Sequence, residues 1–495
     1  MTFIGHPFLF LIFVFVLTPS LAQFDFKNEK IQETYKQIIN LETKKAQRNL
    51  AILSDSSTQP KNGIVYLLEN YLDIIPLLTV QDEGLYQNLK ENEQKRIKQL
   101  KTFSSKSPFY LYSQADIKLQ WAFVELAYGD YINGFFDLKK ANDLIAKNIE
   151  KHPNFHLNGK VKGLIDLLTE AAPEEANIAL IAAGLSRSNS GKSTLIRTAV
   201  FSPLFEEEIN IYLSFIDAYI KNQDELALKK IEKVYLKNPN NLFAQFTYLN
   251  ILSKLKKYQA IVDQLDTNKL HLDTNYLYIP YLDYVEAESL MLRLKLDKAK
   301  LGYKRFIEDT TSSTFHAIAS FNLALIYASQ NQLDSCQIHL STIKSLEISN
   351  LYLDKYAIHV STHTNTINSS LALSRILFDG GFIDSCYTLL TQTTPFENSE
   401  FETERLYRLG RCAWQLNKND QEALTYFLQA SNISVEESPY YFGAYATYYS
   451  GYIYQKKNSN KDAQKLFKKV RHYKNHFYAS GLIEKANSKL KEIEN

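Results

Sequence analysis

The chain is poor in the residues that make tight turns, because its 495 residues include only 16 glycines and 12 prolines. Proteins on average contain about 7% glycine and about 5% proline. All-β and doubly wound α/β proteins need more turn residues than this, so the shortage argues against both classes. We therefore expect an all-α fold. Compact domains usually hold roughly 100–200 residues, so the length indicates several domains or one extended array.

Cysteine is scarce as well. The three cysteines, Cys336, Cys386 and Cys412, are too few and odd in number for a disulfide framework. None belongs to a CxxC or Cys/His pattern, so a zinc site has no support. Cys336 and Cys386 stand in the matching phrases LDSC and IDSC, and we interpret both as small buried residues. We predict neither a metal nor a cofactor.

No charge of one sign dominates, since 56 basic residues face 54 acidic ones and the net charge is +2. This balance gives no reason to expect a nucleic acid or a strongly acidic substrate. Aromatic residues, by contrast, are plentiful, with 33 tyrosines and 29 phenylalanines. Such side chains fill cores and also form partner-binding surfaces. We expect most of them to fill space between helices.

Long apolar runs are missing apart from one at the N-terminus. Phe8–Leu17 is an apolar stretch, and Pro19 and Ser20–Leu21–Ala22 follow it. This pattern is typical of a secretory signal peptide, residues 1–22, cleaved before Gln23. The run is shorter than the about 20 residues that a membrane-spanning helix needs. We expect an exported protein of the periplasm or cell envelope, with no transmembrane segment in the mature chain.

The N-terminal region, residues 23–112, shows helical spacing of apolar residues without a repeat. Asn28–Leu53 has the pattern of one amphipathic helix, and the polar segment Ser54–Gly63 ends it. Ile64–Leu78 and Leu85–Phe103 have the pattern of two further helices.

The stretch Tyr440–Val470 contains small and aromatic residues in alternation: Gly451, Tyr454, Ala463 and Phe467. In a two-helix repeat these residues take places 8, 11, 20 and 24, where small side chains let two helices approach and large ones fill the gaps. The stretch resembles the tetratricopeptide repeat. The resemblance implies a right-handed superhelical array of antiparallel helix pairs, an α-solenoid.

Small residues mark further units upstream. We divide the array into repeats over residues 113–270, which begin with Trp121 and Gly129, and over residues 271–495, which end in a closing helix at Tyr478–Ile493. The marker spacings are 33, 39, 37, 50, 37 and 40 residues, so the array is degenerate and some units have longer helices or turns. The markers are Ala227, Ala260, Ala299, Cys336, Cys386, Ala423 and Ala463.

Aromatic residues recur at one place of the repeat. In the family, these places of the first helix face a concave groove that holds a peptide, so the resemblance implies a protein or peptide partner. Simple stacking between adjacent repeats is the alternative. The candidate partner-binding residues are Tyr284, Phe321, Tyr407 and Tyr448 at place 5, and Tyr445 and Tyr452 at places 2 and 9 of the last unit.

Two motifs suggest chemistry only weakly. The segment Gly184–Thr194 ends like a phosphate-binding loop, but Ser186 stands where the loop needs its first glycine, so we expect a turn between two helices. His472 and His476 are four residues apart, which is metal-ligand spacing, yet no third ligand lies near and we interpret both as solvated. The sequence contains no HExxH or GxSxG motif.

These observations favour a non-catalytic, exported scaffold that binds protein partners in the cell envelope through an aromatic concave groove. Two alternatives stay open. One is an enzyme or nucleotide-binding protein that uses segment 184–194, and the other is a purely structural spacer.

Overall fold

The computed structural model describes residues 23–494 except 56–60, 81, 173, 271–272, 311–312, 347–350, 365 and 417–419. The predicted signal peptide, residues 1–22, lies outside the described residues. The structure is 76% helical. Its described part contains no β-strand, only an isolated bridge between Gln23 and Asn62. The predicted all-α class is confirmed.

The chain forms two compact units. The first comprises the described residues up to Leu78 together with Gln87–Asn210, and the second comprises Thr79–Tyr86 and Ile211–Asn495. The sequence-based boundaries after residues 112 and 270 do not coincide with this division. The reason in the first unit is that the helix from Pro108 belongs to the N-terminal core, where Trp121 Nε1 donates to Asn70 Oδ1 at 3.0 Å.

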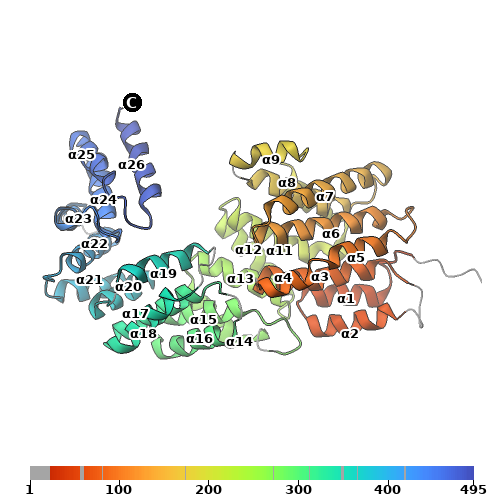
Figure 1. The fold of residues 1–495 in the computed structure, drawn as a ribbon, viewed down its shortest axis with the longest axis horizontal. Helices are drawn as coiled ribbons and strands as arrows, with labels where there is room; N and C mark the ends of the chain where they lie inside the picture. Colours follow the sequence, from red (N-terminus) through yellow and green to blue (C-terminus); the bar gives the residue numbers. More distant parts are fainter. Residues whose placement is uncertain are drawn as a thin grey trace, which may run out of the picture. The chain divides into compact units, whose positions relative to one another are not determined.

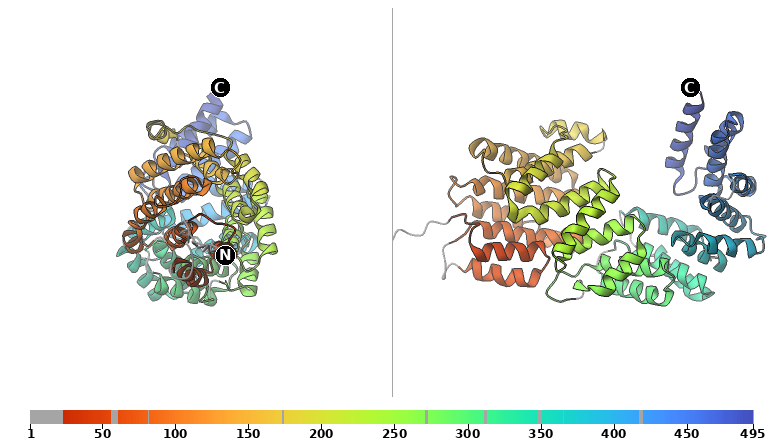
Figure 2. Two further views of the ribbon diagram at one scale, coloured as in Figure 1. Left: turned by 90° about the vertical axis from the view of Figure 1, so that its right-hand side faces the viewer. Right: turned by 180° about the vertical axis from the view of Figure 1, so that it is seen from behind.

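The helices of the first unit stack side by side (Figures 1 and 2). The expected single helix over Asn28–Leu53 is two helices, because Leu41 adopts a left-handed φ of 62° between them. The expected helix over Leu85–Phe103 is also divided, by a turn at Lys90 and Glu91. The bounds are α1 Glu29–Ile39, α2 Thr43–Ser54, α3 Ile64–Val80, α4 Glu83–Leu89, α5 Asn92–Leu100, α6 Pro108–Ala127, α7 Tyr131–Lys151, α8 Asn158–Ala171, α9 Asn177–Ala182 and α10 Gly191–Phe201.

A buried ion network lies at the centre of the first unit. Lys160 is 1% exposed, and its Nζ lies 3.2 Å from Asp116 Oδ2 and 3.1 Å from Glu208 Oε1. Lys160 also donates to the Tyr71 hydroxyl, and Tyr35 donates to Glu208 at 2.6 Å. Burial alone would lower the pKa of Lys160, but Asp116 and Glu208 outweigh it and raise this pKa. The ammonium group therefore stays charged inside the core.

The second unit is built mainly from consecutive helix pairs. In order along the chain, its helices are α11 Glu206–Tyr219, α12 Asp224–Lys237, α13 Leu242–Lys254, α14 Tyr258–Thr267, α15 Pro280–Leu292, α16 Leu296–Asp309, α17 His316–Ser329, α18 Leu333–Lys344, α19 Tyr352–His363, α20 Ser369–Asp379, α21 Ile383–Gln392, α22 Ser399–Gln415, α23 Asp420–Ile433, α24 Phe442–Lys456, α25 Asn460–Val470 and α26 Ala479–Glu494. The division between the two units falls within α11.

The pairs pack where small residues let them approach. A Cβ atom on Gly451 of α24 would lie 2.9 Å from the Phe467 ring of α25, and one on Gly410 of α22 would lie 2.6 Å from the Phe427 ring of α23. Only glycine fits such contacts without movement of the facing ring. The register predicted for Gly451 and Phe467 is confirmed. All seven marker residues fall on the second helix of a pair.

Helix α19 lies between two pairs and belongs to neither. Between Cys336 on α18 and Cys386 on α21 the chain inserts α19, which accounts for the marker spacing of 50 residues at this point. Helix α19 packs against α17 and α18, while α20 and α21 resume the regular pairing. The long spacing therefore reflects an added helix rather than longer helices in one pair.

Candidate partner-binding pocket

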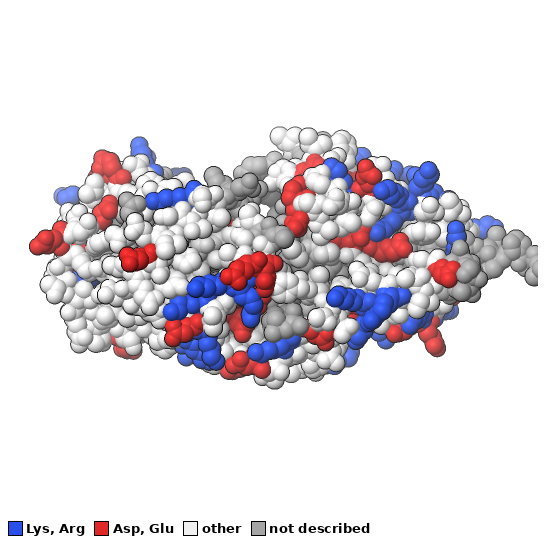
Figure 3. All heavy atoms as spheres, turned by 60° about the horizontal axis from the view of Figure 1, so that its bottom comes forward, with Lys and Arg blue, Asp and Glu red and all other residues white. Residues whose placement is uncertain are grey.

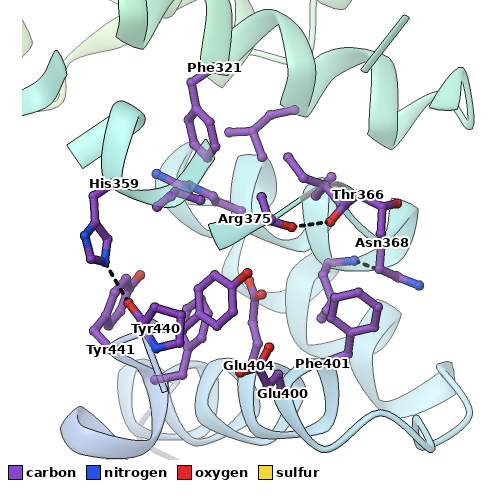
Figure 4. A pocket seen from close by; sticks show the side chains of 18 of the residues that line it. Phe321, His359, Thr366, Asn368, Arg375, Glu400, Phe401, Glu404, Tyr440 and Tyr441 are labelled. Carbon is purple, nitrogen blue, oxygen red and sulfur yellow. Dashed lines mark hydrogen bonds between the residues drawn. The ribbon is translucent and has the colours of Figure 1, made fainter. Parts of the chain in front are cut away.

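A pocket of about 60 Å³ lies in the second unit. Its walls come from α17, α19, α20 and α22, from the turn before α24, and from Phe477 before α26 (Figure 4). Seven of its 20 lining residues are Phe or Tyr, and Arg375, His359, Glu400 and Glu404 supply its charged and titratable groups. We call it the arginine pocket.

Arg375 is the central cation of this pocket. Its Nη1 donates to the Tyr356 hydroxyl at 3.0 Å, and its guanidinium carbon lies 5.0 Å from the centre of the Phe321 ring. Asp379 is the one ion-pair partner of Arg375 among the described residues, at 3.7 Å, and the Asp379 side chain is 49% exposed. Burial alone would lower the pKa of Arg375, but attraction to Tyr356, Tyr441 and Asp379 raises it. A charged group with a loose partner beside aromatic rings is suited to an incoming acceptor.

The two glutamates of the arginine pocket differ. Glu404 accepts from Arg408 Nη2 at 2.6 Å and from Nε at 2.8 Å, so its charge is neutralised. Among the described residues, the Glu400 carboxylate accepts only from Ser438 Oγ, at 3.3 Å. The pocket therefore offers one weakly paired cation and one carboxylate on opposite elements, α20 and α22.

A second cavity of about 180 Å³ borders the other side of Arg375. Glu288 lines it and accepts from the Tyr284 hydroxyl at 3.1 Å. Burial, together with repulsion from Asp379, raises the pKa of Glu288 to about 7, and the bond from Tyr284 only partly opposes this. The carboxyl of Glu288 is thus partly protonated near neutral pH.

Three of the six predicted partner-binding residues lie in the core. Tyr284 is 2% exposed, Phe321 is 1% exposed and Tyr407 is 4% exposed. The Tyr407 hydroxyl accepts from Arg411 Nη1 at 2.9 Å inside the array, and Phe427 and Phe442 pack against its ring. Burial of this degree leaves no open surface, so we assign Tyr284 and Tyr407 to helix packing instead. Phe321 touches the arginine pocket through the face that Arg375 covers.

The other three predicted residues keep exposed surface on α24. Tyr445 and Tyr448 are half-buried, and Tyr452 is 37% exposed. The Tyr445 ring lies 6.3 Å from Tyr478, near the chain segment that closes the arginine pocket, while Tyr452 packs on Trp414. Partner binding through these three stays a prediction.

The segment that resembles a phosphate loop has a packing role. Gly184 has a φ of +66°, and Gly191 begins α10, so the segment is a turn between two helices as expected. A Cβ on Gly191 would lie 2.7 Å from the Gly163 carbonyl oxygen and from the Leu167 side chain, both on α8. Gly191 is therefore needed for the close contact of α8 with α10. No strand precedes it among the described residues.

The histidine pair and the cysteines are the remaining residues that the sequence singled out. His472 is 62% exposed in its side chain, but His476 is only 4% exposed, so the expectation of solvation is wrong for His476. Its ring lies in the aromatic cluster beside Tyr445, and burial and His359 lower its pKa to about 4. The three cysteines are buried and free, which confirms the interpretation of Cys336 and Cys386.

The described residues hold neither a metal-binding cluster nor a membrane-spanning helix. No group of three or more His, Cys, Asp or Glu side chains there is placed to hold a metal ion. No helix in the same residues is both long and apolar enough to cross a membrane.

Sequence reasoning missed Arg375, Tyr356 and the whole of α19. Arg375 and Tyr356 stand outside the repeat places that the family pattern covers. The one available signal was the spacing of 50 residues between Cys336 and Cys386, which marks an insertion.

The helix pairs, crossing at glycines faced by Phe427 and Phe467, settle the architecture. The chain folds as an α-helical repeat array, and its helix pairs are similar to those of the tetratricopeptide repeat. No family model matches it, and no curated protein matches its sequence.

Several solved structures match over most of the chain, but their sequence identities and TM-scores are low. Yeast Tom70 is 14% identical, with 90% of this chain and 96% of that chain covered and a TM-score of 0.28. The human IFIT1 dimer with m7Gppp-AAAA is 13% identical, with 91% and 97% covered and a TM-score of 0.31. Cut9 in the APC/C hetero-tetramer Cut9–Hcn1 is 15% identical, with 93% and 92% covered and a TM-score of 0.27. Scores of this size carry no information about a site or a partner.

Proposed function

We propose that this protein is an exported, non-catalytic scaffold that binds a protein partner in the cell envelope through the arginine pocket. The observation that carries the proposal is Arg375, a cation with one loose ion pair, set among aromatic rings at the wall of a cavity. A peptide supplies both complements at once, since its carbonyl or carboxylate oxygens accept from the guanidinium and its apolar side chains pack on the rings. The apolar run at residues 8–17 supports export.

The groove of this proposal differs from the one expected from the repeat register. Tyr284 and Tyr407 pack inside the array, so the contact surface shifts to Arg375 and the rings around it. Tyr445, whose ring lies 6.3 Å from that of Tyr478, and the half-buried Tyr448 on the same helix are the second candidates for partner contact.

Selection from a random peptide library on the immobilised mature chain tests the proposal. Peptides that bind the chain should lose at least about tenfold in affinity on Arg375→Met, since a charge-assisted hydrogen bond contributes about 1.5–3 kcal/mol. The matched control is Arg471→Met, which removes an exposed arginine at the end of α25. Failure of any peptide to be enriched, or equal binding by the Arg375→Met chain, would refute the proposal.

A further inference from the structure

Helix α19 is held to the array at one end. Asp354, 1% exposed, accepts from the backbone N–H groups of Phe315 at 2.8 Å and Ile318 at 2.9 Å, so its carboxylate caps the start of α17. Helix N-termini carry unpaired N–H groups and a partial positive charge, which makes this a firm attachment.

The opposite side of α19 crosses to segments much later in the chain. His359 Nε2 lies 3.0 Å from the Pro439 carbonyl oxygen, and the Tyr440 hydroxyl donates to the His363 carbonyl oxygen at 3.0 Å. The Tyr352 ring lies 4.8 Å from Phe477. Two helix pairs, α20 with α21 and α22 with α23, lie between α19 and these segments in the sequence. Helix α19 therefore links distant repeats and is not itself part of the regular repeat order.

The residue in the middle of α19 fills the wall of the arginine pocket. The Tyr356 ring lies 6.0 Å from Phe321, 5.7 Å from Phe477 and 5.6 Å from Tyr478. Its hydroxyl accepts from Arg375 Nη1. Tyr356 thus makes both kinds of contact that a bound peptide would make, an oxygen for the guanidinium and an apolar ring for the aromatic wall.

We propose that α19 is an internal strap that occupies part of the arginine pocket, and that a partner binds by displacing it with a helical segment carrying an aromatic residue in the place of Tyr356. This rests on the proposed function and names its regulation and the chemistry of its partner. The outer contacts suit release, because Tyr352 is 56% exposed and two hydrogen bonds to backbone carbonyls join α19 to the 439–440 turn. If a partner binds only when α19 is displaced, the free energy of displacement reduces its affinity. Weakening the strap therefore raises the affinity.

The probe for this proposal is a fluorescein-labelled synthetic peptide of residues 351–364, added to the full mature chain. Substituting Tyr356→Ala and His359→Ala on α19 weakens the strap but leaves Arg375, Phe321 and Phe477 in place. The peptide should bind this strap variant at least about tenfold more tightly than the wild-type chain. A peptide with Tyr356→Ala should not bind.

The control chain carries Lys355→Ala and Thr362→Ala on the exposed side of α19 and should behave as the wild type. Equal affinity for all three chains, or no binding to any of them, would overturn the strap. If the strap variant fails to fold, the single change His359→Ala is measured by hydrogen exchange. Exchange should then become faster in α19 and stay unchanged in α20, and an unchanged α19 would overturn the proposal.

The failure of the strap is distinguishable from failure of the proposed function. Peptides selected on the wild-type chain should bind the strap variant at least about tenfold more tightly. Unchanged binding that still depends on Arg375 would refute the strap and leave the partner site standing. Absence of any selected peptide would refute the partner site itself.

Discussion

At the scale of single residues, the carboxyl of Glu288 makes stability depend on pH. Its pKa of about 7 in the folded chain lies above the about 4.3 of an unfolded glutamate. The folded state therefore binds more protons between these values, and the free energy of unfolding falls as pH rises through this window. Above the folded pKa, Glu288 is ionised in both states and the free energy of unfolding no longer changes because of it.

Glu288→Gln should remove this cost. The variant is expected to melt at a higher temperature than the wild type at about pH 8.5. The difference should shrink as pH falls and vanish at about pH 3.5, where the Glu288 carboxyl is mostly protonated in both the folded and the unfolded chain. Thermal melts at both pH values measure the difference. A stabilisation that is equal at the two pH values would show that the charge of Glu288 plays no part.

The ammonium of Lys160 makes a second residue-scale prediction. Lys160→Met leaves the buried carboxylates of Asp116 and Glu208 without their cation, and breaking such a pair costs about 3–5 kcal/mol. Urea unfolding of the mature chain should show this loss in the first unit. Lys30→Met is the control, because Lys30 pairs with Glu33 at the surface and the two side chains are 40% and 52% exposed. Losses of similar size for the two variants would contradict the account.

The residue scale also shows where sequence reasoning stops. The repeat register assigns Tyr284 and Tyr407 to place 5 of the first helix. The register does not show whether the following helix pair buries their rings. Tyr407 is buried because Phe442 of the following unit packs on it, and Arg411 supplies the partner for its hydroxyl. Arg411 lies only four residues further along α22, but the contact with Phe442 joins two different units, and no local spacing specifies it.

At the scale of helices, the contact of α24 with α25 depends on Gly451. Gly451→Leu should destabilise the C-terminal pairs by about 1–3 kcal/mol or more, since the added side chain meets Phe467, which is fully buried. A thermal melt measures the effect. Lys461→Leu on the exposed face of α25 is the control and should leave the melting temperature nearly unchanged. An unchanged melting temperature for Gly451→Leu would mean that the two helices do not pack at this residue.

Helices were predictable where periodicity and small residues agree, as in α22 to α25. They were misjudged where one backbone angle divides a continuous pattern, as Leu41 does between α1 and α2. Helix α19 shows a third case. The spacing between Cys336 and Cys386 reveals added residues, but its position over the arginine pocket follows from Asp354, His359 and contacts to the 439–440 turn.

At the scale of the whole molecule, charge does not single out one surface. On the face shown in Figure 3, basic and acidic side chains are interspersed, in keeping with the near-balanced composition. Recognition by a large field of one sign is therefore not indicated on that face. We instead propose recognition at the arginine pocket of the second unit, where Arg375 lies among aromatic rings.

Hydrogen exchange of the full mature chain, with and without a peptide selected on it, tests this claim most directly. The peptide should slow exchange in α17, α20 and the start of α22, which line the arginine pocket, and should speed exchange in α19 as the strap is displaced. Helices α21 and α23, which α19 does not cover, should be unaffected. Protection confined to the first unit, or to α18, α21 and α23, would contradict the account.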